Sequence, residues 1–148
     1  MEKKKKVTFA DIAAYTNFSK TTISRYFNDP DSLTIENQET IAKALADLNY
    51  QENKLAKVFA NGKSEFVGII VPNLYLHYYA EMLNQILNTY ENFGYKFLIF
   101  AGKNNEEAER NYIQELLAYK IEGMVILSHT IPSKELASYG VPIVAIER

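Results

Sequence analysis

Polar and basic side chains recur along Ser19–Asn28 at the spacing of one helical face. At about 100° per residue, five of them gather on one side of such a helix: Lys20, Thr21, Ser24, Arg25 and Asn28. The opposite side carries the apolar residues Ile23, Tyr26 and Phe27. One face can therefore pack on a protein core, while the other offers short donors and positive charge suited to a DNA groove. The alternative is an ordinary helix whose polar face is only solvated.

The residues upstream predict a first helix and a short turn that would position this segment. A helix is expected over residues 8–16, where Thr8 and Asp11 have the spacing of a capping box. Asn17 suits the turn, since asparagine tolerates the left-handed backbone of a tight corner. Ser19 can cap the second helix. Helix, short turn and helix form the helix-turn-helix arrangement, which also occurs as a plain packing unit.

A third helix completes the expected all-α, three-helix domain. Ser32 or Thr34 can cap it, and it should run to about Leu48. The residues expected to form the common core are Ile12, Ala13, Ile23, Phe27, Ile41, Ala44, Leu45 and Leu48.

The composition is that of a globular chain and excludes several kinds of site. Of its 148 residues, 47% are hydrophobic and 23% charged, and there is no cysteine, which rules out disulfides and thiolate metal sites. His77 and His129 lie far apart in sequence, so we expect no metal site and no cofactor. No apolar run approaches the roughly 20 residues of a membrane helix. The lysines at 3–6 lack the apolar region of a signal peptide, so a cytoplasmic protein without a membrane partner is expected.

The charge is distributed unevenly along the chain. Residues 1–63 carry ten Lys and Arg against eight Asp and Glu, whereas residues 64–148 carry six against ten. The N-terminal half is thus only mildly basic, and strong non-specific attraction to phosphate is not expected.

From residue 66 onward, apolar runs alternate with helical periodicity. Strands are expected at 66–71, 96–101, 123–127 and 142–146, with helices at 76–93, 105–119 and 132–138. This order predicts an α/β lobe with a doubly wound parallel sheet. The expected division is a DNA-binding domain at 1–50, a hinge helix and linker at 51–65, and a lobe at 66–148. Because the chain stops after the fourth strand, we expect the lobe to be incomplete and the chain to be part of a longer protein.

Several segments together resemble the lactose-repressor (LacI) family of bacterial transcription regulators. They are residues 7–13, 18–28, 48–50, 53, 55–56, 67–72, 94–95, 121–126 and 141–144. The resemblance implies a homodimer or tetramer that binds a palindromic operator in double-stranded DNA. It also implies a core similar to periplasmic sugar-binding proteins, and repression of carbohydrate genes under the control of a small sugar or sugar phosphate. Whether that effector is an inducer or a corepressor stays open.

The resemblance assigns DNA contacts by position. Lys20, Thr21 and Arg25 would reach base edges, Arg25 best of all because arginine bonds guanine through two hydrogen bonds, and Ser24 would touch a base or a phosphate. The residues that would hold the DNA backbone are Thr8, Ser19, Asn28, Thr34 and Asn53. For each hydroxyl, the alternative is a helix cap or a solvated surface.

The hinge carries a candidate wedge for the minor groove. The family usually places a leucine there, and this chain has Phe59 followed by Ala60. Phenylalanine is a known type of wedge. The alternative is that Phe59 belongs to a core or an interface.

The ends of the strands predict a ligand site. In open parallel sheets, ligands bind beyond the carboxyl ends of the strands. The candidate effector-binding residues there are Asn73, Tyr78, Glu147 and Arg148. Tyr79 lies on the apolar stripe of the following helix, so we expect it in the core, and His77 could be a surface residue.

The sequence argues against an enzyme and against a protein that only binds sugar. No Gly-x-Gly-x-x-Gly, no P-loop and no Ser/His/Asp set appears, so no catalytic residue and no enzyme are predicted. A protein that only binds sugar would not need the helix-turn-helix predicted at residues 8–50.

Overall fold

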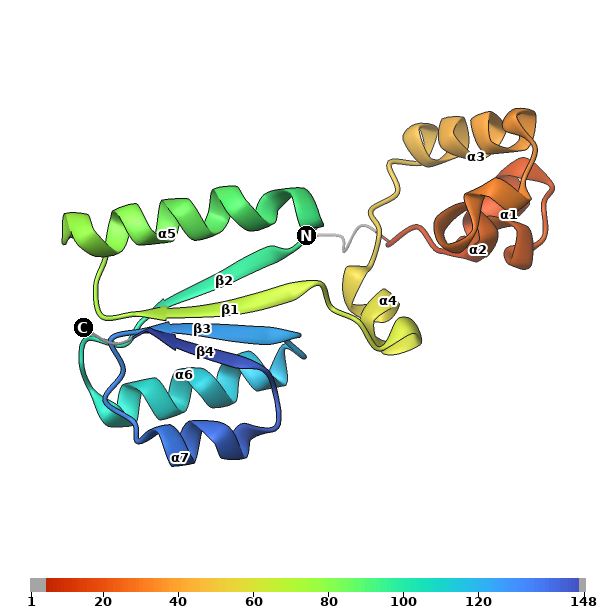
Figure 1. The fold of residues 1–148 in the computed structure, drawn as a ribbon. Helices are drawn as coiled ribbons and strands as arrows, with labels where there is room; N and C mark the ends of the chain where they lie inside the picture. The colour runs from red at the N-terminus through yellow and green to blue at the C-terminus, as the bar shows by residue number, and fades with distance from the viewer. Residues whose placement is uncertain (1–4, 147–148) are drawn as a thin grey trace. The chain divides into compact units, whose positions relative to one another are not determined.

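The computed structural model describes residues 5–146, with the backbone alone for 60 and 61. It divides into two compact units, one reaching to Asn53 and the other starting at Lys54. Figure 1 shows a helical unit and a unit built on a sheet. Each is described by itself.

The first unit, here called the headpiece, contains three helices whose ends follow from local chemistry. These are α1 (Phe9–Thr16), α2 (Lys20–Asn28) and α3 (Ile35–Asp47), with a 3-10 turn η1 (Pro30–Ser32) between the last two. Thr8 and Asp11 form the predicted capping box. Asn17 adopts the predicted left-handed conformation at φ 60°. Ser19 and Thr34 cap α2 and α3, so the cap of α3 is Thr34 rather than Ser32.

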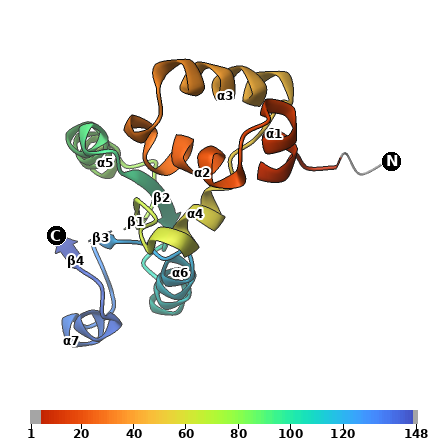
Figure 2. The ribbon, with the colours of Figure 1, turned by 90° about the vertical axis from the view of Figure 1, so that its right-hand side faces the viewer.

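The headpiece core is formed by one isoleucine from each helix. Ile12, Ile23 and Ile41 are fully buried and lie with Ala44 in one cluster. The rings of Phe9 and Phe27 stack beside it, 5.4 Å apart. Figure 2 shows α1, α2 and α3 from another side, and the three pack on one another pairwise. Burial of Ile23 turns the polar face of α2 outward.

The second unit begins with a short helix, α4 (Lys54–Asn61), which ends before Gly62. Gly62 has φ +70°, a conformation that glycine adopts at little cost. The chain then enters the sheet.

The sheet has four parallel strands in the order β2-β1-β3-β4. They are β1 (Phe66–Val71), β2 (Lys96–Ala101), β3 (Gly123–Leu127) and β4 (Ile143–Ile146). Phe66 pairs with Lys96 on one side of β1, and Val67 pairs with Gly123 on the other. The predicted doubly wound α/β lobe is therefore confirmed.

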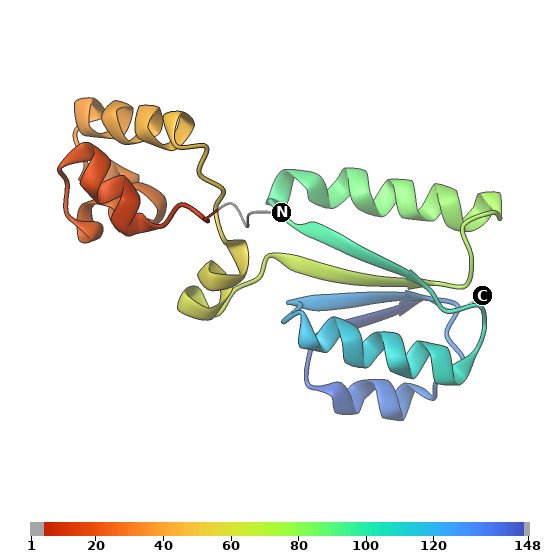
Figure 3. The same ribbon diagram turned by 180° about the vertical axis from the view of Figure 1, so that it is seen from behind.

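Helices cover both faces of this sheet. α5 (His77–Tyr90) lies on one face, while α6 (Glu106–Ala118) and α7 (Ser133–Leu136) lie on the other, as Figure 1 and the view from behind in Figure 3 show. The expected helix up to Gly94 ends in a 3-10 turn, η2 (Glu91–Phe93), and the expected helix at 132–138 is α7 followed by η3 (Ala137–Tyr139).

Each face of the sheet has its own core. Ile69 and Val71 of β1 pack with Tyr79 and Leu83 of α5. Ile70 of β1 belongs to the other core, whose buried members are Ile70, Ile113, Leu116, Ile121, Met124, Ile126, Ile131 and Leu136. Successive residues of β1 thus serve opposite faces, as the pleat of a strand requires.

We predict that Ile41→Ala destabilises the headpiece strongly, whereas Ile35→Ala does not. Both isoleucines lie on α3, but Ile41 is 0% exposed and Ile35 is 75% exposed. Ile41→Ala should lower the free energy of unfolding by about 2–5 kcal/mol, through lost burial and a cavity. Ile35→Ala should change it by less than about 0.5 kcal/mol. Protection of headpiece amides from hydrogen exchange measures both values, and equal losses would contradict the core described above.

Candidate functional site

The polar face of α2 is open to contact. Lys20, Thr21 and Arg25 are exposed and Ser24 is half-buried. Because the opposite face is held by Ile23, these four side chains share one side of the helix. Their arrangement can present two positive charges and two hydroxyls to a partner.

Ser24 and Asn28 form a pair along this face. The Nδ2 of Asn28 donates to the Oγ of Ser24 over 3.1 Å, one helical turn away. The hydroxyl of Ser24 keeps its own hydrogen for donation. A contact of Ser24 with DNA therefore leaves this pair intact if Ser24 is the donor.

Three of the predicted backbone-contacting hydroxyls are helix caps. Thr8, Ser19 and Thr34 accept the N–H of Asp11, Thr22 and Asn37, at 3.4, 3.1 and 3.2 Å respectively. All three caps are exposed. Capping and phosphate contact are compatible, because a helix N-terminus itself attracts an anion.

Thr8 differs from the other two caps because a carboxylate lies against its hydroxyl, whereas the hydroxyl of Ser19 lies 2.9 Å from that of Thr22. Its Oγ1 also donates to Oδ2 of Asp11 over 3.0 Å. Hydrogen bonds from the backbone and side chain of Thr8 lower the pKa of Asp11, which keeps that carboxylate charged. A phosphate at Thr8 would have to displace this bond and approach a negative charge.

The hinge residues are exposed. Phe59 on α4 is 82% exposed and Leu55 is 61% exposed, so neither side chain is buried in a core of the described structure. Asn53 is exposed directly before α4. The side chain of Ala60 lies outside the described residues.

The segments after the strands form the rim of the lobe, defined here as residues 73–79, 102–105 and 128–130. Oδ1 of Asn73 accepts the N–H of Leu76 over 3.1 Å, so Asn73 shapes the loop into α5. Tyr78 is 55% exposed and its ring lies edge-on to that of Tyr79, 5.2 Å away. Tyr79 is buried, which confirms its predicted core position. Glu147 and Arg148 lie outside the described residues.

The structure also contains a buried carboxylate that the sequence reasoning missed. Glu109 of α6 is 3% exposed, and its Oε2 accepts both the N–H and the Oγ1–H of Thr130, at 3.0 and 2.7 Å. Glu109 is one of three acidic residues in the first turn of α6, where negative side chains are favoured by the helix dipole. Its position four residues before Ile113 and seven before Leu116, on the apolar side of α6, is the signal that could have found it.

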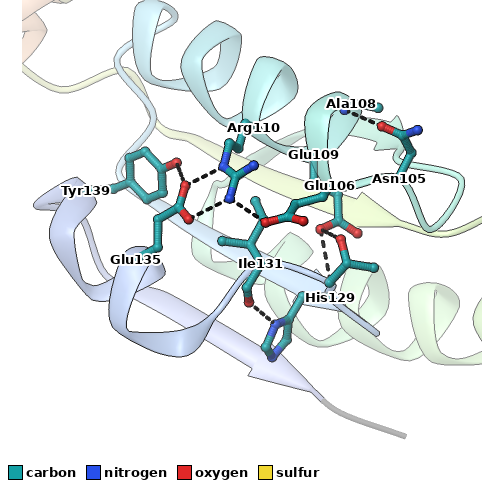
Figure 4. Close-up of polar contacts among 10 residues, drawn as sticks. Asn105, Glu106, Ala108, Glu109, Arg110, His129, Ile131, Glu135 and Tyr139 are labelled. Atoms are coloured by element: carbon teal, nitrogen blue, oxygen red, sulfur yellow. Dashed lines mark hydrogen bonds and ion pairs between the residues drawn. The ribbon is translucent and has the colours of Figure 1, made fainter.

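Arg110, the residue after Glu109 on α6, forms an ion pair with α7. Nε and Nη2 of Arg110 bond the two carboxylate oxygens of Glu135, at 2.6 and 2.9 Å, and Arg110 also pairs with Glu106 (Figure 4). The hydroxyl of Tyr139 donates to Oε1 of Glu135 over 3.2 Å. The hydrogen bond from Arg110 is the main reason that the pKa of Glu135 is lowered.

Other kinds of site are not seen in the described part of the chain. Among residues 5–146, no three His, Asp or Glu side chains lie where they could hold a metal ion. Within the same residues, no helix has the length and apolar character needed to cross a membrane.

Two family profiles match the chain, one for each unit. "Bacterial regulatory proteins, lacI family" matches residues 8–53, and "Periplasmic binding proteins and sugar binding domain of LacI family" matches residues 64–148. The chain belongs to the LacI family of bacterial regulatory proteins. The predicted family is confirmed.

Curated LacI-family relatives align along almost the whole chain. The sucrose operon repressor of Pediococcus pentosaceus is 26% identical over 138 residues, which are 93% of this chain and 42% of that protein. The HTH-type transcriptional regulator KdgR of Bacillus subtilis is 30% identical, over 95% of this chain and 43% of its own length. The chain thus spans less than half the length of these relatives, and both relatives are named as regulators rather than enzymes.

A solved LacI-family structure shows the same fold. It is the lac repressor dimer bound to operator and the anti-inducer ONPF, at a TM-score of 0.82 and 26% identity, covering 95% of this chain and 44% of that one. The combination of a helical headpiece and a parallel α/β lobe is therefore shared.

We predict that the Arg110–Glu135 pair stabilises the lobe above, but not below, the folded-state pKa of Glu135. A carboxyl whose pKa is lowered by folding contributes stability above its unfolded pKa of about 4.3, and loses it as the pH falls through the folded pKa. Glu135→Gln should therefore lower the melting temperature at pH 7, and the difference from the parent should vanish in acid. The exposed Glu115→Gln on α6 is the matched control. Parallel curves for Glu135→Gln and the parent at all pH values would contradict this role.

Proposed function

We propose that this protein is a sequence-specific DNA-binding regulator, acting as a repressor of carbohydrate-metabolism genes under the control of a small sugar or sugar phosphate. The single observation that carries the proposal is the exposed polar face of α2, held outward by Ile23 in a headpiece of the LacI family. We place this activity in the cytoplasm, where bacterial operators lie, and infer a regulatory role without catalysis.

The headpiece is suited to the major groove of DNA. The second helix of a helix-turn-helix enters that groove and presents its first residues to base edges. Lys20 and Thr21 begin α2, and Arg25 follows one turn later on the same face. We assign base contacts to these three and to Ser24. We assign phosphate contacts to Thr8, Ser19, Asn28, Thr34 and Asn53, with Ser19 and Thr34 favoured over Thr8, whose hydroxyl lies against the negative carboxylate of Asp11.

We propose a homodimer on a palindromic operator, or a tetramer built from such dimers. A two-fold protein matches two half-sites related by the same symmetry. In support, the described chain leaves large apolar side chains exposed, among them Tyr90 of α5, Phe93 of η2 and Ile99 of the edge strand β2. Unpaired strand edges and apolar surface are normally covered in the assembled protein. The lac repressor, which shares this fold, was solved as a dimer on its operator.

We propose that the rim binds the effector, with Asn73 and Tyr78 as contacts and with Glu147 and Arg148, which lie outside the described residues. Amide, carboxylate and guanidinium groups suit sugar hydroxyls, and an exposed tyrosine ring suits the apolar face of a sugar. Relatives named as repressors of sucrose and ribose operons support a sugar as the effector class.

Control would operate through a shift between two conformations of the dimer. A ligand moves such an equilibrium only by binding one state better than the other. α4 has eight residues, which is marginal for a helix in water by itself. Two such hinge helices can therefore form on the operator and melt when the effector changes the dimer geometry.

The proposal is tested by binding of the complete gene product to random and to selected palindromic DNA, over a range of salt concentrations. A panel of mono- and disaccharides and their phosphates is then added. Strong preference for one sequence, abolished or created by one sugar, supports the proposal. Equal weak binding to all DNA would refute sequence-specific regulation, and turnover of a sugar would refute the absence of catalysis.

We predict that Arg25→Ala reduces sequence discrimination. Loss of a two-bond contact with guanine should cost about 1–3 kcal/mol at one base pair of the operator, and little on random DNA. Competition binding with single-base operator variants measures it. Lys43→Ala, an exposed cation of α3, is the control. If Arg25→Ala weakens binding equally on every sequence, Arg25 contacts only phosphate.

We predict that Phe59→Ala weakens operator binding and reduces DNA bending. An apolar side chain inserted between base pairs unstacks them and bends the duplex away from the protein. Fluorescence energy transfer between the ends of an operator fragment reports the bend. Tyr119→Ala, which removes another exposed aromatic ring outside the hinge, is the control. An unchanged bend in Phe59→Ala would assign Phe59 to an interface between protein chains.

A further inference from the structure

We propose that Glu109 is a positioning residue for sugar binding: its buried carboxylate fixes the rim segment after β3 without touching the sugar. This inference rests on the proposed effector site at the rim, and it adds a residue that lies beneath that site. It is carried by the contact between α6 and Thr130 and by the packing of Glu109 against the end of β2.

The contact with Thr130 is specific and partly buried. One oxygen of Glu109 accepts two hydrogen bonds from the same residue, from its backbone N–H and from its hydroxyl. The carboxylate is almost fully buried, while Thr130 is exposed at the rim. A buried carboxylate is costly unless it is hydrogen-bonded, so the fold favours the arrangement in which Thr130 stays in place.

Glu109 also packs beneath the rim segment after β2. A Cβ added at Gly102 would lie 2.9 Å from Cγ of Glu109, so the glutamate fills the space that a side chain at Gly102 would need. Asn105, the cap of α6, ends this segment, and its carbonyl accepts the N–H of Glu109 over 2.9 Å. One residue thus lies against the rim segments of two strands, β2 and β3.

The segment after β3 needs such support because its backbone is strained. Ser128 has φ +53°, a left-handed conformation that is unfavourable for a residue other than glycine. Its N–H donates to the carbonyl of Ile146 over 2.7 Å, and Nδ1 of His129 lies 2.7 Å from the carbonyl of Ile131. The first bond joins the segment to β4, the second lies within the segment, and Glu109 joins the segment to α6.

Arg110 holds the other end of the segment that connects β3 to α7. Glu109 bonds Thr130 just after β3, and Arg110 bonds Glu135 on α7, as Figure 4 shows for the second pair. Two consecutive residues of α6 therefore tie both ends of the segment 130–135. A rim that is held in its binding conformation before the sugar arrives loses less entropy on binding.

The test uses Glu109→Ala and Glu109→Gln in the complete gene product. The amide oxygen of glutamine can accept the two hydrogen bonds of Thr130, whereas alanine cannot. Glu107→Ala, an exposed neighbour in the same helical turn, is the matched control. Three quantities are measured: hydrogen exchange at the Thr130 amide, the Kd for each sugar of the panel containing sucrose and D-ribose, and the Kd for operator DNA without sugar.

We expect Glu109→Ala to accelerate exchange at Thr130 and to raise the Kd of the bound sugar about tenfold, as loss of hydrogen bonds to a buried acceptor suggests. Operator affinity without sugar should stay within about twofold of the parent, since the headpiece is a separate unit. Glu109→Gln should restore most of the sugar affinity. In a Thr130→Val background, Glu109→Ala should raise the Kd of the sugar by a smaller factor than it does in the parent protein, because the two residues act together.

The outcomes separate this proposal from the proposed function. Equal sugar affinity in Glu109→Ala and the parent, or unchanged exchange at Thr130, overturns the role of Glu109 alone. Loss of sugar and operator binding together assigns Glu109 to general stability, which also overturns it. If no sugar of the panel binds the parent, the effector half of the proposed function fails, and the role of Glu109 fails with it. If Glu109→Ala does not fold, Glu109→Gln and Thr130→Val carry the same comparison.

Discussion

Burial of both faces of β1 is the constraint on which the sheet unit depends. β1 pairs with β2 on one side and β3 on the other, and its alternate residues enter two separate cores. A strand buried in this way leaves its backbone groups no partner but neighbouring strands, and parallel neighbours require helical connections that cover both faces. The loops at the carboxyl ends of the strands are then brought to one edge. The candidate ligand rim is a consequence of how β1 is buried.

The headpiece follows the same logic on a smaller scale. Three isoleucines, one from each helix, meet in the buried core and fix how each helix is rotated about its axis. Once Ile23 is inside, Arg25 and Thr21 must be outside, because a helix places neighbours in sequence about 100° apart. The helix caps have a second property. Ser19 and Thr34 cap the N-termini of α2 and α3, and a helix N-terminus attracts phosphate. In the proposed regulator, Ser19 and Thr34 would therefore serve both helix stability and DNA binding.

α4 contrasts with both cores. Its large apolar side chains, Leu55 and Phe59, are exposed, and eight residues are too few to hold a helix firmly in water. α6 shows the opposite design, in which Glu109 points inward and Arg110 outward, and both are paired. In the proposed regulator, the lobe would be the rigid part that senses the ligand. The hinge would be the part whose folding depends on what it contacts.

Features that depend on neighbours along the chain can be predicted from the amino-acid sequence. Caps at Thr8 and Ser19, the turn at Asn17, the exposed face of α2 and the run of strands and helices all follow from periodicity and local hydrogen bonding. The order of the strands and the pairs Glu109–Thr130 and Arg110–Glu135 could not be predicted in this way and are known from the folded structure. The position of Glu109 on the apolar side of α6 could be seen in the sequence, but its donor lies beyond β3, and no periodicity relates the two. Contacts between residues distant in sequence are fixed by how the elements pack, and packing is settled by the whole core at once.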